Sequence, residues 1–126
     1  MIIRGTVSNK GEANILLQVH GPLGTVDVSV LIDTGFTGSI TLPAAMIASL
    51  GLQRRSRGSA YLADGSEQEF NVYTGTISWG DSRREVLVSE LGNEPLAGMR
   101  LLRNHELRIR VVPGGTVEVS PLTPDQ

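Results

Sequence analysis

Apolar residues recur at every second position along several short stretches of this chain, which is the pattern of half-buried β-strands. Residues 2–7, 14–19 and 25–32 are the first three such stretches. In the third stretch, alternate residues from Val26 to Ile32 share one face, and the stretch ends in a continuous apolar run. Such an ending is typical of a strand that passes from a half-exposed surface into the interior. We therefore expect three strands before residue 33.

Helical signals occur at two places. Pro43 suits a first helical turn, because a backbone N–H there has no intrahelical acceptor. Residues 44–50 follow it, and Gly51 stands where a left-handed C-terminal cap belongs. Residues 97–104 predict a second short helix.

The rest of the chain has the pattern of hairpins and their turns. Residues 58–79 predict a long hairpin with its tip at residues 63–66, and residues 84–89 predict the next strand. Two alternating strands near the C-terminus are joined by turn formers at residues 113–115. The expected fold class is all-β, mainly antiparallel, with one or two short helices.

Composition favours one folded domain. Of 126 residues, 40% are hydrophobic and 19% are charged, which is typical of globular chains and not of disordered ones. We expect the domain to span residues 1–120 and residues 121–126 to form a flexible tail.

Charge and cysteine content exclude several classes of protein and of functional site. Eleven basic and thirteen acidic residues leave a net charge of −2, whereas proteins that coat nucleic acid or membrane surfaces are far more basic. The chain has no cysteine, which excludes disulfides, thiolate zinc sites and thiol nucleophiles.

Other signals are missing as well. The two histidines, His20 and His105, do not have the spacing of metal ligands. No apolar run approaches the ~18 residues of a membrane helix, and the first residues lack the pattern of a signal peptide. We expect no metal, no cofactor, no membrane contact and a cytoplasmic location.

Residues 54–57, with the sequence RRSR, form the densest basic run. One interpretation is a solvated loop. The other is a contact with nucleic acid, made by a small antiparallel barrel whose binding would be sensitive to salt. The nearly balanced charge favours the loop, and we expect no nucleic-acid partner.

Asp33-Thr34-Gly35 is the segment that could carry chemistry, because it directly follows the apolar run at residues 30–32. A carboxylate at the end of a buried strand needs a reason, since an unpaired buried charge is costly. In one interpretation Asp33 caps a turn and Gly35 takes a positive φ. In the other, Asp33 activates water, Gly35 lets substrate approach the backbone, and the Thr34 hydroxyl fixes the loop.

Three segments resemble, in order, those of the retropepsin-like aspartic proteases, the single-domain relatives of pepsin. LIDTG at residues 31–35 resembles the catalytic loop of that family. The hairpin with Ala63-Asp64-Gly65 at its tip resembles the flap, and LAGMRLL at residues 96–102 resembles the glycine element that leads into a short helix. The resemblance covers about residues 3–119 and extends to bacterial members of the family. It implies a closed acid-protease barrel.

The resemblance implies an aspartic endopeptidase that hydrolyses peptides or proteins. The chain has one Asp-Thr-Gly, so the two carboxylates of the mechanism would be the two copies of Asp33 in a homodimer. Thr34 would hydrogen-bond across the dimer axis and Gly35 would offer its carbonyl to substrate. The hairpin tip would close over the peptide.

Three positions depart from the family pattern. Retroviral members often pair an Asp with an Arg at the positions held here by Thr37 and Met99, so both halves of that ion pair are missing and no orphan charge remains. Phe36 stands where a small residue is frequent, which predicts a narrower or repositioned pocket. The residues expected to contact substrate are Gly35, Thr37, Ala63, Asp64 and Gly65.

A different class of function stays open at this stage. The same fold could serve as a binding or dimerisation module without significant protease activity. An Asp33→Asn variant separates the two hypotheses, because only an enzyme should lose its function with this carboxylate.

Overall fold

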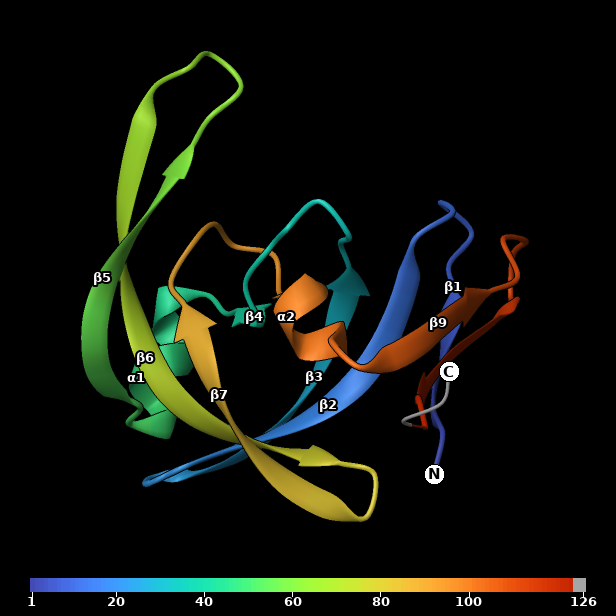
Figure 1. Cartoon of the computed structure of the whole chain (residues 1–126). Helices are drawn as coiled ribbons and strands as arrows, with labels where there is room; N and C mark the ends of the chain where they lie inside the picture. Colours follow the sequence, from blue (N-terminus) through green and yellow to red (C-terminus); the bar gives the residue numbers. More distant parts are fainter. Residues whose placement is uncertain (124–126) are drawn as a thin grey trace.

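The computed structural model describes residues 1–123 and consists mostly of β-strands (Figure 1). Strands account for 55% of the structure and helices for 9%, which confirms the expected β class. The elements in chain order are β1 (Ile3–Val7), β2 (Ala13–Gly21), β3 (Gly24–Ile32), β4 (Ile40–Thr41), α1 (Ala44–Leu50), β5 (Gln53–Tyr61), β6 (Glu67–Trp79), β7 (Ser82–Ser89), β8 (Leu96–Ala97), α2 (Met99–Leu102), β9 (His105–Ile109) and β10 (Thr116–Pro121).

Six strands close into a barrel in the order β6, β7, β4, β8, β3 and β2, and a short pairing between β2 and β6 completes the circle. Most neighbours are antiparallel, but β3 runs parallel to β8 and β4 runs parallel to β7. The sheet continues beyond the barrel through β1, β10 and β9 on one side and through β5 on the other. The predicted closed, mainly antiparallel barrel with two short helices is confirmed at this level.

Alternation along the strands fills the barrel interior. In β2, Ile15, Leu17 and Val19 are at most 1% exposed, whereas Leu16 between them is 64% exposed. Burying every second side chain stabilises one face of the strand through the hydrophobic effect and leaves the other face to solvent. The predicted inward face of β3 is also confirmed, because Val28 and Val30 are buried.

Helix α1 matches its prediction. Gly51 has φ +66°, and its N–H donates to the carbonyls of Ile47 and Ala48, which satisfies two of the carbonyls left free at a helix end. Ile47 and Leu50 are buried against the barrel. Among residues 1–123 neither helix is long and apolar enough to cross a membrane.

Helix α2 is shorter than predicted. It covers Met99–Leu102 only, because Ala97 is taken up by strand β8 and pairs there with Ile32 and Ile40. The expected loop at residues 54–57 was wrong, since these residues lie in β5 and pair with β6. Their side chains are exposed, as expected for a basic run.

The predicted flexible tail, residues 121–126, starts too early in the chain. Pro121 belongs to β10 and pairs with His105, and the Leu122 N–H donates to the Asn104 carbonyl at 2.9 Å. These contacts tie residues 121 and 122 to the sheet. The rest of the predicted tail, residues 124–126, lies outside the described residues.

Candidate functional site

Asp33 lies at the carboxyl end of β3, where the neighbouring parallel strand β8 fixes its backbone. The Asp33 N–H donates to the Ala97 carbonyl at 2.9 Å, and the Leu31 N–H donates to the Pro95 carbonyl at 2.9 Å. The side chain of Asp33 is half-buried. The sequence therefore places a carboxylate at the edge of the barrel, where β3 leaves the interior.

A tight turn orients the Asp33 carboxylate. Its Oδ1 accepts a hydrogen bond from the Gly35 N–H at 2.9 Å, and the Asp33 carbonyl accepts one from the Phe36 N–H at 3.1 Å. Within residues 1–123 no second hydrogen bond or ion pair reaches this carboxylate. One oxygen is thus fixed by the backbone, and the other is free to bind water.

The turn interpretation is confirmed in part: the Asp33 Oδ1 accepts from the Gly35 N–H, but the positive φ that it assigned to Gly35 is wrong. A Cβ on Gly35 would lie 3.2 Å from the Asp33 Oδ1, so glycine leaves space there. Thr34 does not fix the loop within one chain, since its side chain is exposed and its hydroxyl has no hydrogen bond within residues 1–123. Backbone hydrogen bonds hold the loop instead.

The segment that begins α2 closes the loop from the other side. The Gly98 N–H donates to the Ser39 carbonyl at 2.8 Å, and the Met99 N–H donates to the Phe36 carbonyl at 2.8 Å. A Cβ on Gly98 would lie 2.3 Å from the carbonyl oxygen of Gly38 and 2.7 Å from that of Phe36. The φ of Gly98 is −107°, so glycine is required here for close approach and not for its dihedral freedom.

Thr41 of β4 ties the same region together. Its side chain is fully buried. Its Oγ1 donates to the Glu94 carbonyl at 2.9 Å and accepts from the Leu96 N–H at 2.9 Å. Because Leu96 pairs with Leu31 at the end of β3, this hydroxyl supports the strands that carry Asp33.

A cleft of about 390 Å³ lies between the Asp33 loop and the β5–β6 hairpin. Gly35 and Thr37, two of the residues expected to contact substrate, line it on the loop side. The other lining residues come from the loop, from the hairpin, and from the end of β7 and the segment after it; they are Phe36, Gly38, Ser59, Ala60, Tyr61, Phe70, Ser89 and Leu91.

The hairpin residues of this cleft were missed by sequence reasoning, which considered only the hairpin tip. Their place follows from register: Gly58 pairs with Phe70, and the Phe70 ring lies where a Cβ on Gly58 would be. A β-bulge between Arg54 and Ser56 shifts that register, and no local pattern reveals such a shift.

Ala63, Asp64 and Gly65 form the exposed tip of the hairpin, which extends beyond the barrel (Figure 1). Gly65 has φ +85°, and the Asp64 Oδ1 accepts hydrogen bonds from the Ser66 hydroxyl and from the Ser66 N–H. These two bonds, the hydroxyl first, hold the pKa of Asp64 below its ordinary value. The tip does not line the cleft, so its contact with substrate stays a prediction.

The chemistry that this arrangement supports is that of a single oriented carboxylate. Across residues 1–123 there is no group of three or more His, Cys, Asp or Glu side chains that could hold a metal ion. Asp33 itself is not among the residues that line the cleft, but Gly35, whose N–H holds its Oδ1, is. A carboxylate with one fixed and one free oxygen can act as a general base toward water.

Comparison with models of known protein families and with curated protein sequences gives no match to this chain. The function must therefore be inferred from the geometry of the Asp33 loop and from its sequence motifs.

Proposed function

We propose that this protein is a retropepsin-like aspartic endopeptidase that acts as a homodimer. The observation that carries the proposal is the presentation of Asp33: a half-buried carboxylate at the end of a core strand, with one oxygen held by the Gly35 N–H. The loop around it is braced by Gly98 and by α2. These are the segments in which the sequence resembles that family.

Hydrolysis of a peptide by this chemistry needs two carboxylates that share one proton. The ionised carboxylate takes a proton from water, and the water oxygen attacks the carbonyl carbon of the scissile bond. The protonated carboxyl polarises the carbonyl oxygen and stabilises the charge that develops there. When the C–N bond breaks, the leaving amine takes up the proton that the first carboxylate removed from water.

The chain supplies one such carboxylate, so the second belongs to Asp33 of another copy related by a two-fold axis. The free hydroxyl of Thr34 suits this arrangement, because it is exposed and has no hydrogen bond within residues 1–123. Like charges at close range repel each other, so the proposed dyad holds one shared proton. Activity is therefore expected to favour mildly acidic pH.

The peptide would lie in the cleft between the loop and the hairpin. Its volume of about 390 Å³ lies within the range of ligand pockets. Tyr61, which is 78% exposed, and Phe70 give the hairpin side of the cleft aromatic surface for apolar substrate side chains. Movement of the hairpin tip over the peptide would exclude water from the reaction.

The test is cleavage of a diverse peptide library between about pH 4 and 7 by wild type and by Asp33→Asn, at a concentration where sedimentation shows a dimer. Wild type is expected to cleave, and Asp33→Asn to lose about 10³-fold or more of the rate. Asp27→Asn is the matched control, because Asp27 is an exposed carboxylate on the same strand, and it should keep the wild-type rate. Cleavage that survives in Asp33→Asn would contradict the proposal.

A further inference from the structure

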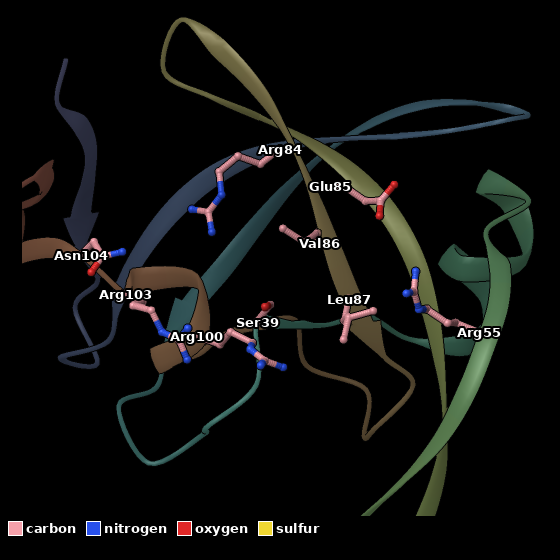
Figure 2. Close-up of a pocket in the computed structure, with 9 residues that line it drawn as sticks. All are labelled: Ser39, Arg55, Arg84, Glu85, Val86, Leu87, Arg100, Arg103 and Asn104. Carbon is pink, nitrogen blue, oxygen red and sulfur yellow. The ribbon is translucent and has the colours of Figure 1, made fainter.

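A second cavity, of about 430 Å³, shares no lining residue with the cleft beside Asp33. Strand β7, helix α2 with the residues after it, and strand β5 surround it (Figure 2). Four arginines line it, and we call it the arginine cavity; they are Arg55, Arg84, Arg100 and Arg103.

The charge of this cavity is opposite to that of the protein. The chain has a net charge of −2, whereas the cavity has four guanidinium groups and one carboxylate, that of Glu85. Within residues 1–123 the ion pairs are Arg4 with Glu118 and Arg57 with Glu69. None of the four cavity arginines is therefore neutralised by a carboxylate within salt-bridge distance.

Arg84 is held in place before any ligand arrives. Its Nη1 donates to the Leu101 carbonyl at 3.1 Å, and its guanidinium carbon lies 5.1 Å from the centre of the Trp79 ring. Trp79 is itself fixed, because its N–H donates to the His105 Nε2 at 3.0 Å. Burial lowers the pKa of Arg84 from its ordinary value, because partial loss of solvent disfavours the charged form.

Arg100 and Arg103 line the cavity from α2 and the residue after it, across from β7, which carries Arg84 (Figure 2). The backbone of Arg100 is held by its N–H, which donates to the Gly38 carbonyl at 3.1 Å. A guanidinium presents several N–H donors in a planar fork, which matches the oxygens of a phosphate group. One guanidinium held in place, that of Arg84, and two exposed ones across the hollow can together bind two such groups of one molecule.

We propose that the arginine cavity binds a small phosphorylated ligand that carries two or more negative charges. The cavity volume lies in the range of small-molecule sites. Its charge is gathered in an open hollow between three elements, and not spread along an extended stripe as in proteins that follow a nucleic-acid backbone. Leu87, which is half-buried and also lines the cavity, offers apolar surface to the organic part of a ligand.

The test is titration of the full chain with pyrophosphate by calorimetry, at constant ionic strength. We expect binding of one pyrophosphate per chain with a Kd below about 1 mM. The double variant Arg100→Gln/Arg103→Gln should weaken it at least about tenfold, because it removes charge-assisted hydrogen bonds. Both side chains are exposed, so the variant should fold. Arg83→Gln is the matched control, since Arg83 is the exposed neighbour of Arg84 on β7 and does not line the cavity.

Three results obtained with small ligands would overturn the proposal: no binding up to about 10 mM pyrophosphate, equal weakening by Arg83→Gln, or tighter binding of citrate, which would indicate a polycarboxylate ligand. Tighter binding of a DNA duplex with the same dependence on Arg100 and Arg103 would assign the cavity to nucleic acid instead. Asp33→Asn should bind pyrophosphate like wild type. The outcome is therefore independent of whether the protein is a protease.

Discussion

Thr41 shows how much the region around Asp33 depends on one buried hydroxyl. Thr41→Val keeps the shape of the side chain and removes both of its hydrogen bonds, the one donated to the Glu94 carbonyl and the one accepted from the Leu96 N–H. Because Thr41 is 0% exposed, water cannot replace the hydroxyl at this position. The variant should therefore be less stable than wild type.

The size of this loss of stability follows from the two backbone groups that lose their hydrogen bond to Thr41. The Leu96 N–H loses its acceptor beside a buried side chain, at a cost of about 1–3 kcal/mol. Glu94 is exposed, so water can solvate its carbonyl and the second loss is about 0.5–1 kcal/mol. The added methyl group returns at most about 0.8 kcal/mol. The free energy of unfolding should fall by about 1–3 kcal/mol.

Urea unfolding measures this loss. With an m-value near about 2 kcal/mol/M, the midpoint should fall by about 0.5–1.5 M. Thr116→Val is the matched control, because Thr116 is an exposed strand residue with no side-chain hydrogen bond within residues 1–123, and its midpoint should stay near that of wild type. Equal midpoints for Thr41→Val and wild type would refute the argument that this hydroxyl braces the strands.

Two further predictions concern the loop and the hairpin. Gly98→Ala should lower the free energy of unfolding by at least about 2 kcal/mol, because its Cβ would lie 2.3 Å from a backbone oxygen. The control Met99→Ala changes a side chain that is 48% exposed and should lower it far less. Similar losses of stability for the two variants in urea unfolding would contradict the steric argument. In the folded chain the pKa of Asp64 lies below 3.8, so the ionised turn stabilises the fold above the unfolded pKa, and this contribution disappears as pH falls through the folded pKa. Ser66→Ala should raise the Asp64 pKa measured by NMR titration, and an unchanged value would show that the hydroxyl is not the main cause.

Local patterns predicted most of the fold. Alternation identified β2 and β3 because half of each strand faces the barrel interior. The strands β4 and β8 were missed, since each has two residues and exists only through pairing with distant segments. Strand β5 was partly taken for a loop, because it lies beyond the barrel and most of its side chains are exposed.

Only the part of the candidate site that is formed by consecutive residues could be predicted from the sequence. The position of Asp33 after an apolar run predicted its place at the end of a core strand. The hairpin side of the cleft depends on strand register, which the sequence does not display locally. The arginine cavity combines Arg55, Arg84 and Arg100 from three separate elements, and only tertiary structure brings them around one hollow.

The central claim is that one active site needs Asp33 from two chains, and mixed dimers test it most directly. Wild type and Asp33→Asn are mixed in equal amounts, allowed to exchange subunits, and assayed for peptide cleavage at constant total protein. If the dyad spans the dimer, only wild-type homodimers are active and the rate falls to about a quarter of that of wild type. A rate of about half would mean that each chain carries a complete site, and it would contradict the account.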